Sequence, residues 1–313
     1  MKEQDVIADD GTWQRMADKV EEITAMFAVS ALGIGKPYKD RCLARKDDIG
    51  QRRLACEWRQ RPVDELHAEI QSQLEQANDH LRMLARALAV PRIIFSPFSL
   101  ARGVMLASAQ AFYLCDPGVS LVDRVGRLLN FHYKANRFLR TMVDDGPGTL
   151  APAERSQLAQ VIDELVRSTQ HLGLTIKYPK DDTSKEPAYL GDKFPDDIDL
   201  VGALLGQDGE LEYGQFAFRL FSAGVHAQPH LLTILSTHTT GAGREGMIAA
   251  QRGVAGEVLT GIAASAAAGY VTACERAMSY FGVESSTPRM DSAMAILVDL
   301  SAPARTTASR STS

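Results

Sequence analysis

The chain has 313 residues, of which 45% are hydrophobic and 23% are charged, and these values are ordinary for a globular protein that buries a full core. Its net charge of −5 argues against a protein that coats nucleic acid without specificity, because phosphate backbones attract excess positive charge. The four cysteines are far apart, which predicts neither a zinc site nor a disulfide framework and favours a reducing, cytoplasmic setting. The acidic N-terminus lacks an apolar run, so we expect no ordinary signal peptide.

The first sixty residues predict helices around a basic segment. An apolar stripe with helical spacing runs from Trp13 to Leu32 and ends at the glycines that follow it. Residues 36–61 then carry nine lysines and arginines against four acidic residues. We expect a solvated helical surface with a loop here, and an edge that faces a polyanion is the alternative. Residues 1–62 are therefore assigned to an N-terminal helical region with a basic segment.

The next part of the chain, residues 63–300, is assigned to one helical domain that begins with a long helix over 64–89. A helical hairpin follows. Ser96 is expected to cap its first helix, and an Asp-Pro-Gly turn ends that helix. Ser120, with an aspartate three residues later, resembles a capping box that opens the second helix. The second helix carries one apolar stripe, made of Leu121, Val125, Leu128, His132, Ala135, Leu139 and Met142.

After the hairpin the chain predicts further helices separated by loops rich in proline and glycine. Helices are expected over 152–173, 198–205 and 210–223, with a loop of turn-forming residues over 178–197. A Gly-x-Gly-x-x-Gly string at 241–246 lacks the repeated βαβ context of a dinucleotide site. A glycine-rich turn between helices is therefore expected there, and no cofactor is predicted.

The last predicted core element is a helix over 247–281. Its uncharged run, 258–273, is shorter than the ~20 residues that span a bilayer and is rich in small side chains. We therefore expect a buried central helix and no membrane span. Residues 301–313 lack core-forming side chains and are predicted to be a disordered tail. Together these elements predict an all-α fold, a multi-helix bundle.

Histidines are the natural candidates for chemistry because imidazole titrates near neutral pH. A nearby arginine can hold a phosphate while the imidazole moves a proton, which is metal-free ribonuclease chemistry. Of the Arg–His pairs with suitable spacing, only Arg219 and His226 lie near a helix end, where Gly224 could bend the backbone so that the side chains converge. We therefore predict His226 as the acid–base group and Arg219 as the phosphate-binding group.

Arg102 and His132 are candidate substrate-binding residues, and each has a structural alternative. Arg102 interrupts the apolar face of the first hairpin helix, so we expect it half-buried and anchored by an acid or by helix C-terminal carbonyls. His132 lies on the apolar stripe, where a hydrogen-bonded core histidine is the structural alternative. No metal site is predicted, because Pro229 interrupts the only close histidine pair and no acid lies near it.

Several short motifs between residues 64 and 283 match a known pattern. They are His80-Leu81, Pro91, Leu100-x-Arg102, Phe112-Tyr113-Leu114-Cys115-Asp116-Pro117, and Phe218-Arg219-Leu220-Phe221-Ser222 with His226. In these motifs the chain resembles a family of all-helical bacterial proteins that is itself similar to the HEPN superfamily. The resemblance implies a helical, HEPN-like fold, dimerisation and, for active members of the superfamily, RNA cleavage between protomers. The chain departs from the pattern at Leu106 and Phe218, where the family has Glu and Tyr.

Three functions are compatible with these observations. The first is an HEPN-like protein that binds RNA, forms a homodimer and cuts RNA without a metal, using His226 and Arg219. The second is a non-catalytic protein-interaction module, which predicts a large exposed apolar patch. The third is a small-molecule enzyme with a deep apolar pocket between helices near Arg102, His132 and His226.

Overall fold

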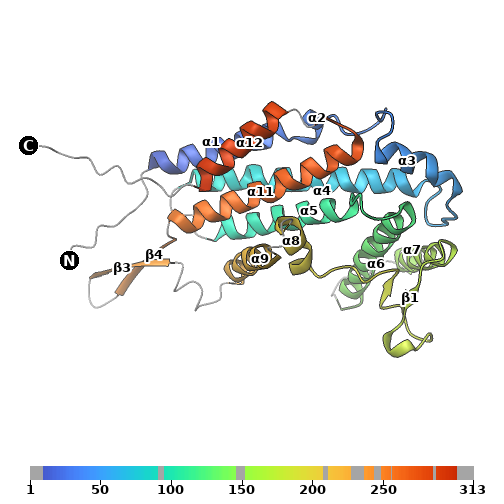
Figure 1. The fold of residues 1–313 in the computed structure, drawn as a ribbon. Helices are drawn as coiled ribbons and strands as arrows, with labels where there is room; N and C mark the ends of the chain where they lie inside the picture. The colour runs from blue at the N-terminus through green and yellow to red at the C-terminus, as the bar shows by residue number, and fades with distance from the viewer. Residues whose placement is uncertain are drawn as a thin grey trace, which may run out of the picture.

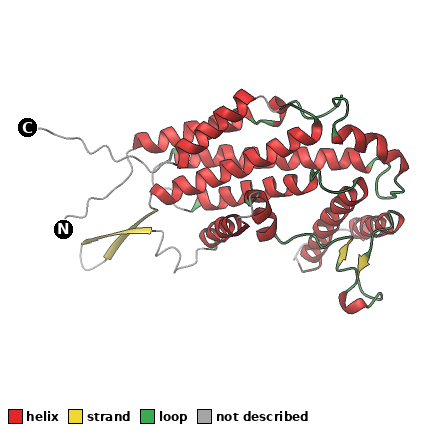
Figure 2. Cartoon of the chain, viewed as in Figure 1, coloured by secondary structure: helices red, strands yellow, loops and turns green. Residues whose placement is uncertain are grey.

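The computed structural model describes residues 10–90, 95–145, 152–206, 211–226, 236–242, 248–254, 256–284 and 287–301. Most of these residues are helical, which confirms the predicted all-α class (Figures 1 and 2). The elements in chain order are α1 (Asp10–Met26), α2 (Val29–Leu32), α3 (Leu43–Gly50), η1 (Gln51–Arg53), α4 (Pro62–Leu88), α5 (Ser96–Leu114), α6 (Leu121–Asp145), α7 (Pro152–His171), β1 (Ile176–Lys177), η2 (Pro179–Asp181), β2 (Tyr189–Leu190), α8 (Asp197–Leu205), α9 (Leu211–Val225), β3 (Ser236–Ala242), β4 (Ile248–Val254), α11 (Gly256–Phe281) and α12 (Thr287–Ser301).

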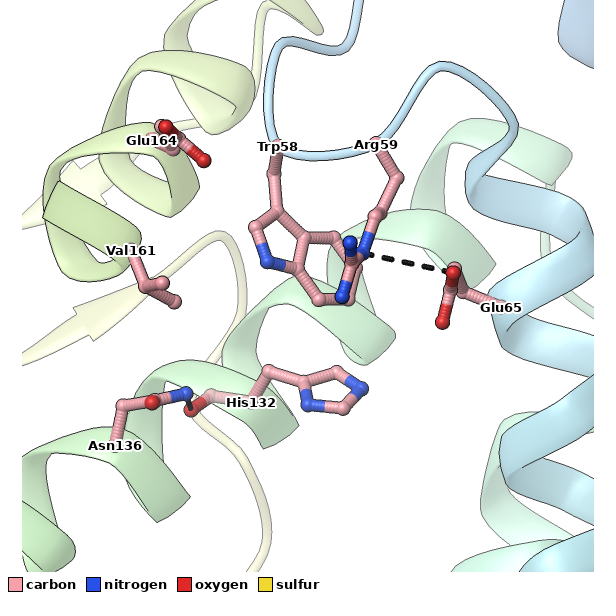
Figure 3. A pocket seen from close by; sticks show the side chains of 7 residues that line it. All are labelled: Trp58, Arg59, Glu65, His132, Asn136, Val161 and Glu164. Atoms are coloured by element: carbon pink, nitrogen blue, oxygen red, sulfur yellow. Dashed lines mark hydrogen bonds and ion pairs between the residues drawn. The ribbon is translucent and has the colours of Figure 1, made fainter. Parts of the chain in front are cut away.

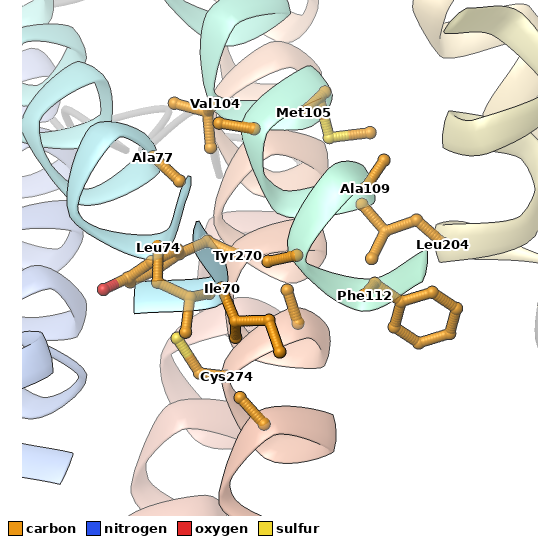
Figure 4. Close-up of a cluster of buried hydrophobic side chains, with 14 of the residues drawn as sticks. Ile70, Leu74, Ala77, Val104, Met105, Ala109, Phe112, Leu204, Tyr270 and Cys274 are labelled. Atoms are coloured by element: carbon orange, nitrogen blue, oxygen red, sulfur yellow. The ribbon is translucent and has the colours of Figure 1, made fainter. Parts of the chain in front are cut away.

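Three long helices, α4, α5 and α11, run side by side through the centre of the molecule (Figure 1). Helices α1 and α12 cover one side of this layer, α8 and α9 cover the other, and α6 with α7 stand at one end. The side chains between the central helices are fully or almost fully buried (Figure 4). They include Ile70, Leu74, Ala77, Val104, Met105, Ala109, Phe112, Tyr270 and Cys274.

Helix α11 is the buried central helix that its uncharged run predicts. Its alanines and Gly269 allow α5 to approach closely, since a Cβ on Gly269 would lie 2.8 Å from the sulfur of Met105. By length and composition the stretch Val258–Phe281 is apolar enough to cross a membrane, but 67% of its most apolar part is buried inside the protein. Its apolar character therefore serves the core.

The N-terminal region shares this core. Helix α1 packs on α4, α11 and α12, and its buried residues belong to the same apolar cluster as those of the later helices. Residue 62 is therefore the start of α4 and does not separate two cores. The predicted tail lies outside the described residues from position 302 onward.

The basic segment is largely neutralised by acids. Five of its nine basic residues form ion pairs, namely Lys36, Lys39, Arg45, Arg59 and Arg61. Their partners come from the same segment, from α4 and from the end of α11. The segment is thus a solvated, ion-paired surface over α3 and the loops beside it, as the first of the two interpretations predicts.

Of the two predicted N-caps, the one at Ser96 is wrong and the one at Ser120 is confirmed. Helix α5 begins at Ser96 itself, with Phe95 before it and no side-chain cap, so Ser96 is not the N-cap. At α6 the capping box is confirmed, because the Ser120 hydroxyl accepts from the Asp123 N–H at 3.2 Å and donates to the Asp123 carboxylate at 2.7 Å. A serine before a helix caps it only when the chain leaves the helix at that residue.

The helix predicted over 247–281 begins nine residues later than expected, at Gly256. Before it, β3 and β4 form an antiparallel pair with Ser236 opposite Val254 and Ala242 opposite Ile248. The glycine-rich string therefore lies between strands and not between helices, although residues 243–247 themselves are outside the described part. Threonines favour a strand here because β-branched side chains fit a pleated surface.

Candidate functional site

Helices α5 and α9 pack against each other in antiparallel fashion and carry three of the four predicted site residues. At one end of the contact the Arg102 guanidinium lies over the Phe218 ring, 5.3 Å from its centroid. At the other end the Phe98 ring occupies the space beside Gly224, where a Cβ would lie only 2.4 Å from the ring. Gly224 therefore permits close packing. It does not bend the helix, because the His226 N–H donates to the Ser222 carbonyl at 3.0 Å and continues the helical turn.

Arg219 and His226 are both exposed on one face of α9. Seven residues of α-helix turn through nearly two full turns and rise about 10 Å, so the two side chains share a face but start about 10 Å apart. The predicted convergence of the two groups at a broken helix is therefore wrong within one protomer.

Arg102 is half-buried as predicted, but its anchor differs from the prediction. Neither an acid nor a carbonyl holds it, and its buried Nε has no hydrogen-bond partner. One reason is Leu106, since a glutamate four residues after Arg102 would stand on the same face of α5. The Phe218 ring instead supports the guanidinium by a cation–π contact.

Ser222 is the second polar residue of this contact without a partner. Its hydroxyl oxygen is buried and makes no hydrogen bond. It lies along α9 between Phe218 and Gly224, the two points at which α9 touches α5. Because buried polar atoms are almost always hydrogen-bonded, an unpaired guanidinium nitrogen and an unpaired hydroxyl on facing helices need an explanation.

The cations of this face also lack acidic partners. Within the described ranges no carboxylate oxygen lies within 4.0 Å of the charged nitrogens of Arg102, Arg219 or His226. Other arginines do form ion pairs, as Arg124 does with Asp47 at 2.8 Å. We call Arg102, Arg219, Ser222 and His226 the α5–α9 face. It can accept an anion without first breaking an ion pair.

His132 lies in a different place. Its ring packs against the Trp58 ring at a tilt of 44°, with centroids 4.7 Å apart (Figure 3). The His132 Nε2 is 3.7 Å from a carboxylate oxygen of Glu69. Burial lowers the pKa of His132, so its ring is neutral at pH 7. It is thus neither a fully buried core residue nor part of the α5–α9 face, but one wall of a small cavity.

The predicted common pocket of Arg102, His132 and His226 is wrong. The His80 ring packs on Gly103 beside Arg102, whereas Glu69 contacts His132. His80 and Glu69 are eleven residues apart on the straight helix α4, which corresponds to about 16 Å. The two best-defined cavities of the described part lie at α6 and contain neither Arg102 nor His226.

A buried hydrogen-bond chain, which spacing alone did not single out, links five segments. Asp47 accepts from the Arg124 guanidinium at 2.8 and 2.9 Å and from the Tyr280 hydroxyl at 2.7 Å. Since that hydroxyl has one proton, its oxygen accepts from His67 Nε2 at 3.0 Å, and His67 Nδ1 accepts from the Tyr38 hydroxyl at 2.6 Å. Burial lowers the pKa of His67 to about 4, which keeps the ring neutral in this role.

Each member of the chain is satisfied by its neighbours. We therefore assign the chain to stability and not to a ligand. The only sequence signal for this hydrogen-bond chain was that Arg61 and His67 form one of the Arg–His pairs with suitable spacing, and such pairs are common by chance.

No group of three or more His, Cys, Asp or Glu side chains in the described residues could hold a metal ion. Comparison with protein-family models, with curated proteins and with solved structures finds no match to this chain. The resemblance to the HEPN superfamily therefore stays a prediction, and the function has to be argued from the sites themselves.

Proposed function

We propose that this protein is an HEPN-like RNA-binding protein whose α5–α9 face holds phosphate groups of RNA. The observation that carries the proposal is the buried Arg102 Nε without an acceptor. A phosphate oxygen is the acceptor that such a nitrogen prefers, and the planar guanidinium suits it better than an ammonium does. The unpaired Ser222 hydroxyl supplies a second donor for the same anion.

The exposed residues of α9 extend this site along an RNA backbone. Within the described residues, neither Arg219 nor His226 has an acidic partner that would have to be released. Their separation of about 10 Å suits neighbouring phosphates better than one phosphate. The face is small, which fits an acidic protein that binds RNA at one place and does not coat it.

Binding to a fluorescently labelled single-stranded RNA, measured by anisotropy at several salt concentrations, tests this proposal. Arg219→Glu should weaken binding at least tenfold and reduce the salt dependence, because one phosphate contact is replaced by repulsion. Arg53→Glu is the matched control, since Arg53 is also exposed and lies in the basic segment. Equal losses in the two variants, or a loss only in Arg53→Glu, would overturn the proposal.

Metal-independent cleavage is the finer part of this proposal. His226 takes the proton of a 2′-hydroxyl, the 2′-oxygen displaces the 5′-oxygen of the next nucleotide, and water protonates the leaving oxygen. Because the two side chains start about 10 Å apart along α9 in one protomer, we place the acting Arg219 on one protomer of a homodimer and the acting His226 on its partner. The proposed dimer belongs in the cytoplasm, where the four free thiols stay reduced.

A mixing experiment tests the shared site. Arg219→Ala and His226→Ala proteins should each be inactive in EDTA, and their mixture should regain up to half of the activity, because a mixed dimer contains one complete site. Cleavage that persists in His226→Ala, or a mixture as inactive as its components, contradicts the shared site. RNA binding would still be tested separately by the anisotropy experiment.

A second candidate function, a protein-interaction module, is favoured by α6. Its stripe packs into the core through Val125 and Leu128, but the half beyond His132 is exposed and has no partner among the described residues. Phe138, Leu139 and Met142 are 68%, 47% and 56% exposed. With Ala135 they follow the i, i+3, i+4, i+7 spacing by which one helix packs on another. We call these four residues the α6 stripe.

We propose that the α6 stripe pairs with the same stripe of a second copy across a twofold axis. Sedimentation velocity should show a dimer that Phe138→Asp converts to a monomer. Val298→Asp is the matched control, because Val298 on α12 is 66% exposed and lies outside the stripe. A wild-type chain that stays monomeric at 100 µM, or an equal effect of both substitutions, contradicts pairing through α6. A dimer with a micromolar dissociation constant, which corresponds to a binding free energy of about 8 kcal/mol, would be almost fully formed at that concentration.

A further inference from the structure

The cavity beside His132 lies at the junction of the segment after η1 with α4, α6 and α7 (Figure 3). Its volume is about 290 Å³, close to the lower end of the range for small-ligand sites. The lining residues are Trp58, Arg59, Glu65, His132, Asn136, Val161 and Glu164. We call it the Trp58 cavity. It shares no residue with the α5–α9 face.

The walls of the Trp58 cavity are held in place without a ligand. The Ser168 hydroxyl on α7 accepts from the backbone N–H groups of Glu57 and Trp58 at 2.9 and 2.8 Å. The Arg167 side chain of α7 donates to the Glu57 carboxylate at 2.7 Å. The His132 ring then supports the indole from α6. A cavity with walls fixed by these contacts does not have to be ordered when a ligand binds.

The charge around the Trp58 cavity is negative. Arg59 is the only permanent cation of the lining, and it pairs with Glu65 at 3.5 Å. Glu164 forms no ion pair among the described residues: its carboxylate accepts from the Gln160 amide at 2.8 Å, and Arg167, which donates to Glu57, attracts it only from a greater distance. Glu69 lies behind His132, does not line the cavity and accepts from the Gln73 amide at 2.8 Å. The Glu164 carboxylate is thus the one left for a cation from outside.

The indole of Trp58 adds a donor to these acceptors. The residue is only 8% exposed, yet its Nε1–H has no hydrogen-bond partner within the described part of the chain. Figure 3 shows this nitrogen on the edge of the ring that faces Val161 and Asn136 across the cavity. Asn136 donates its amide to the His132 carbonyl at 2.7 Å, which leaves its side-chain oxygen as a further acceptor. The indole nitrogen is not one of the fully buried unpaired atoms, so its N–H is accessible and can donate to an acceptor in the cavity.

We propose that the Trp58 cavity binds a small organic ammonium ion that also carries a hydrogen-bond acceptor. Its ammonium group lies near Glu164, and its acceptor receives the hydrogen of Trp58 Nε1. The apolar part of the ligand lies against Val161 and the edge of the indole. This recognition needs one positive charge and one acceptor on a molecule of about ten heavy atoms.

Isothermal titration with tyramine and tyrosol tests this site, because these two molecules differ only in an ammonium group against a hydroxyl. Tyramine should bind with a millimolar or lower dissociation constant, and tyrosol at least tenfold more weakly. Glu164→Gln should weaken tyramine binding about tenfold, and Trp58→Phe, which keeps an aromatic ring but removes the N–H, should also weaken it. Thermal unfolding of each variant verifies that the fold is retained.

Asp163→Asn is the matched control, since Asp163 is the exposed neighbour of Glu164 on α7 and does not line the cavity. It removes the same charge and should leave tyramine binding within twofold of wild type. The proposal is overturned if tyramine does not bind at 10 mM, if tyrosol binds equally well, or if Asp163→Asn weakens binding as much as Glu164→Gln does. A folded Trp58→Phe protein that binds tyramine with unchanged affinity would show that the indole N–H does not contact the ligand, and this outcome also contradicts the proposal.

Discussion

Replacing Arg124 by methionine is the most informative single perturbation of this fold. The guanidinium is 2% exposed and donates to both oxygens of Asp47, at 2.8 and 2.9 Å, and to the carbonyls of Asp116 and Val119 at the turn before α6. It therefore joins α3, α6 and the end of α5. Methionine fills most of the same volume but offers no donor.

The magnitude follows from what Asp47 loses. After the substitution its buried carboxylate keeps only the Tyr280 hydroxyl as a donor. An uncompensated buried charge of this kind costs about 3–5 kcal/mol, which is a large part of the roughly 5–15 kcal/mol that stabilise a folded protein. Asp47→Asn combined with Arg124→Met should lose less than the sum of the two single variants, because the double variant buries no unpaired charge.

Urea denaturation followed by circular dichroism measures the effect as a lower midpoint at constant slope. Arg127→Met is the matched control, because Arg127 lies one turn further along α6 and pairs at 3.1 Å with Asp116, whose side chain is 28% exposed and so keeps contact with water. We expect a loss of about 1 kcal/mol or less for Arg127→Met. If Arg124→Met and Arg127→Met lose similar amounts, the assignment of Arg124 as a buried structural ion pair is wrong.

Two further predictions concern stability. Burial lowers the pKa of His67 from 6.5 to about 4, so the unfolded chain binds more protons between these values. The free energy of unfolding should therefore fall by up to about 3 kcal/mol as the pH drops from 6.5 to 4. In urea titrations, the free energy of unfolding of His67→Gln should depend less steeply on pH, and equal pH dependence in the two proteins would contradict the buried neutral ring. Gly214→Ala should destabilise by roughly 1–3 kcal/mol, because its Cβ would lie 2.6 Å from the Val201 carbonyl oxygen, whereas Gly261→Ala, with no atom within 4 Å, should stabilise by about 1 kcal/mol. Thermal unfolding checks this opposite pair, and effects of the same sign would refute the packing argument.

Periodicity predicted the main helices because the spacing of apolar residues and the positions of proline and glycine are local properties of the chain. The helices over 64–89, 152–173 and 198–205 are within a few residues of α4, α7 and α8. Periodicity did not predict the β3–β4 pair, since strand pairing depends on a partner that is distant in sequence. Periodicity also placed the apolar residues of α6 from Leu121 to Met142 on one face of the helix. It did not show that the rest of the chain covers only the first half of that face.

The candidate sites show the same division. The sequence identified Arg219, His226, Arg102 and His132 by residue type and spacing, and the structure brings three of them to the α5–α9 contact while it places His132 at the Trp58 cavity. Nothing local marks Trp58, because its role depends on Ser168, more than a hundred residues away in the chain. The sequence does not show that Arg102 Nε is unpaired either, because this depends on the lack of a hydrogen-bond acceptor beside it on the packed helix α9.

By itself, then, the sequence determined the helical class, most helix positions and the types of side chain available for chemistry. Only the tertiary structure decided which of these side chains meet, which lose their water and which find a partner. The physical reason is that helix formation is governed by neighbours within a few residues, whereas burial and hydrogen-bond satisfaction depend on segments brought together by packing.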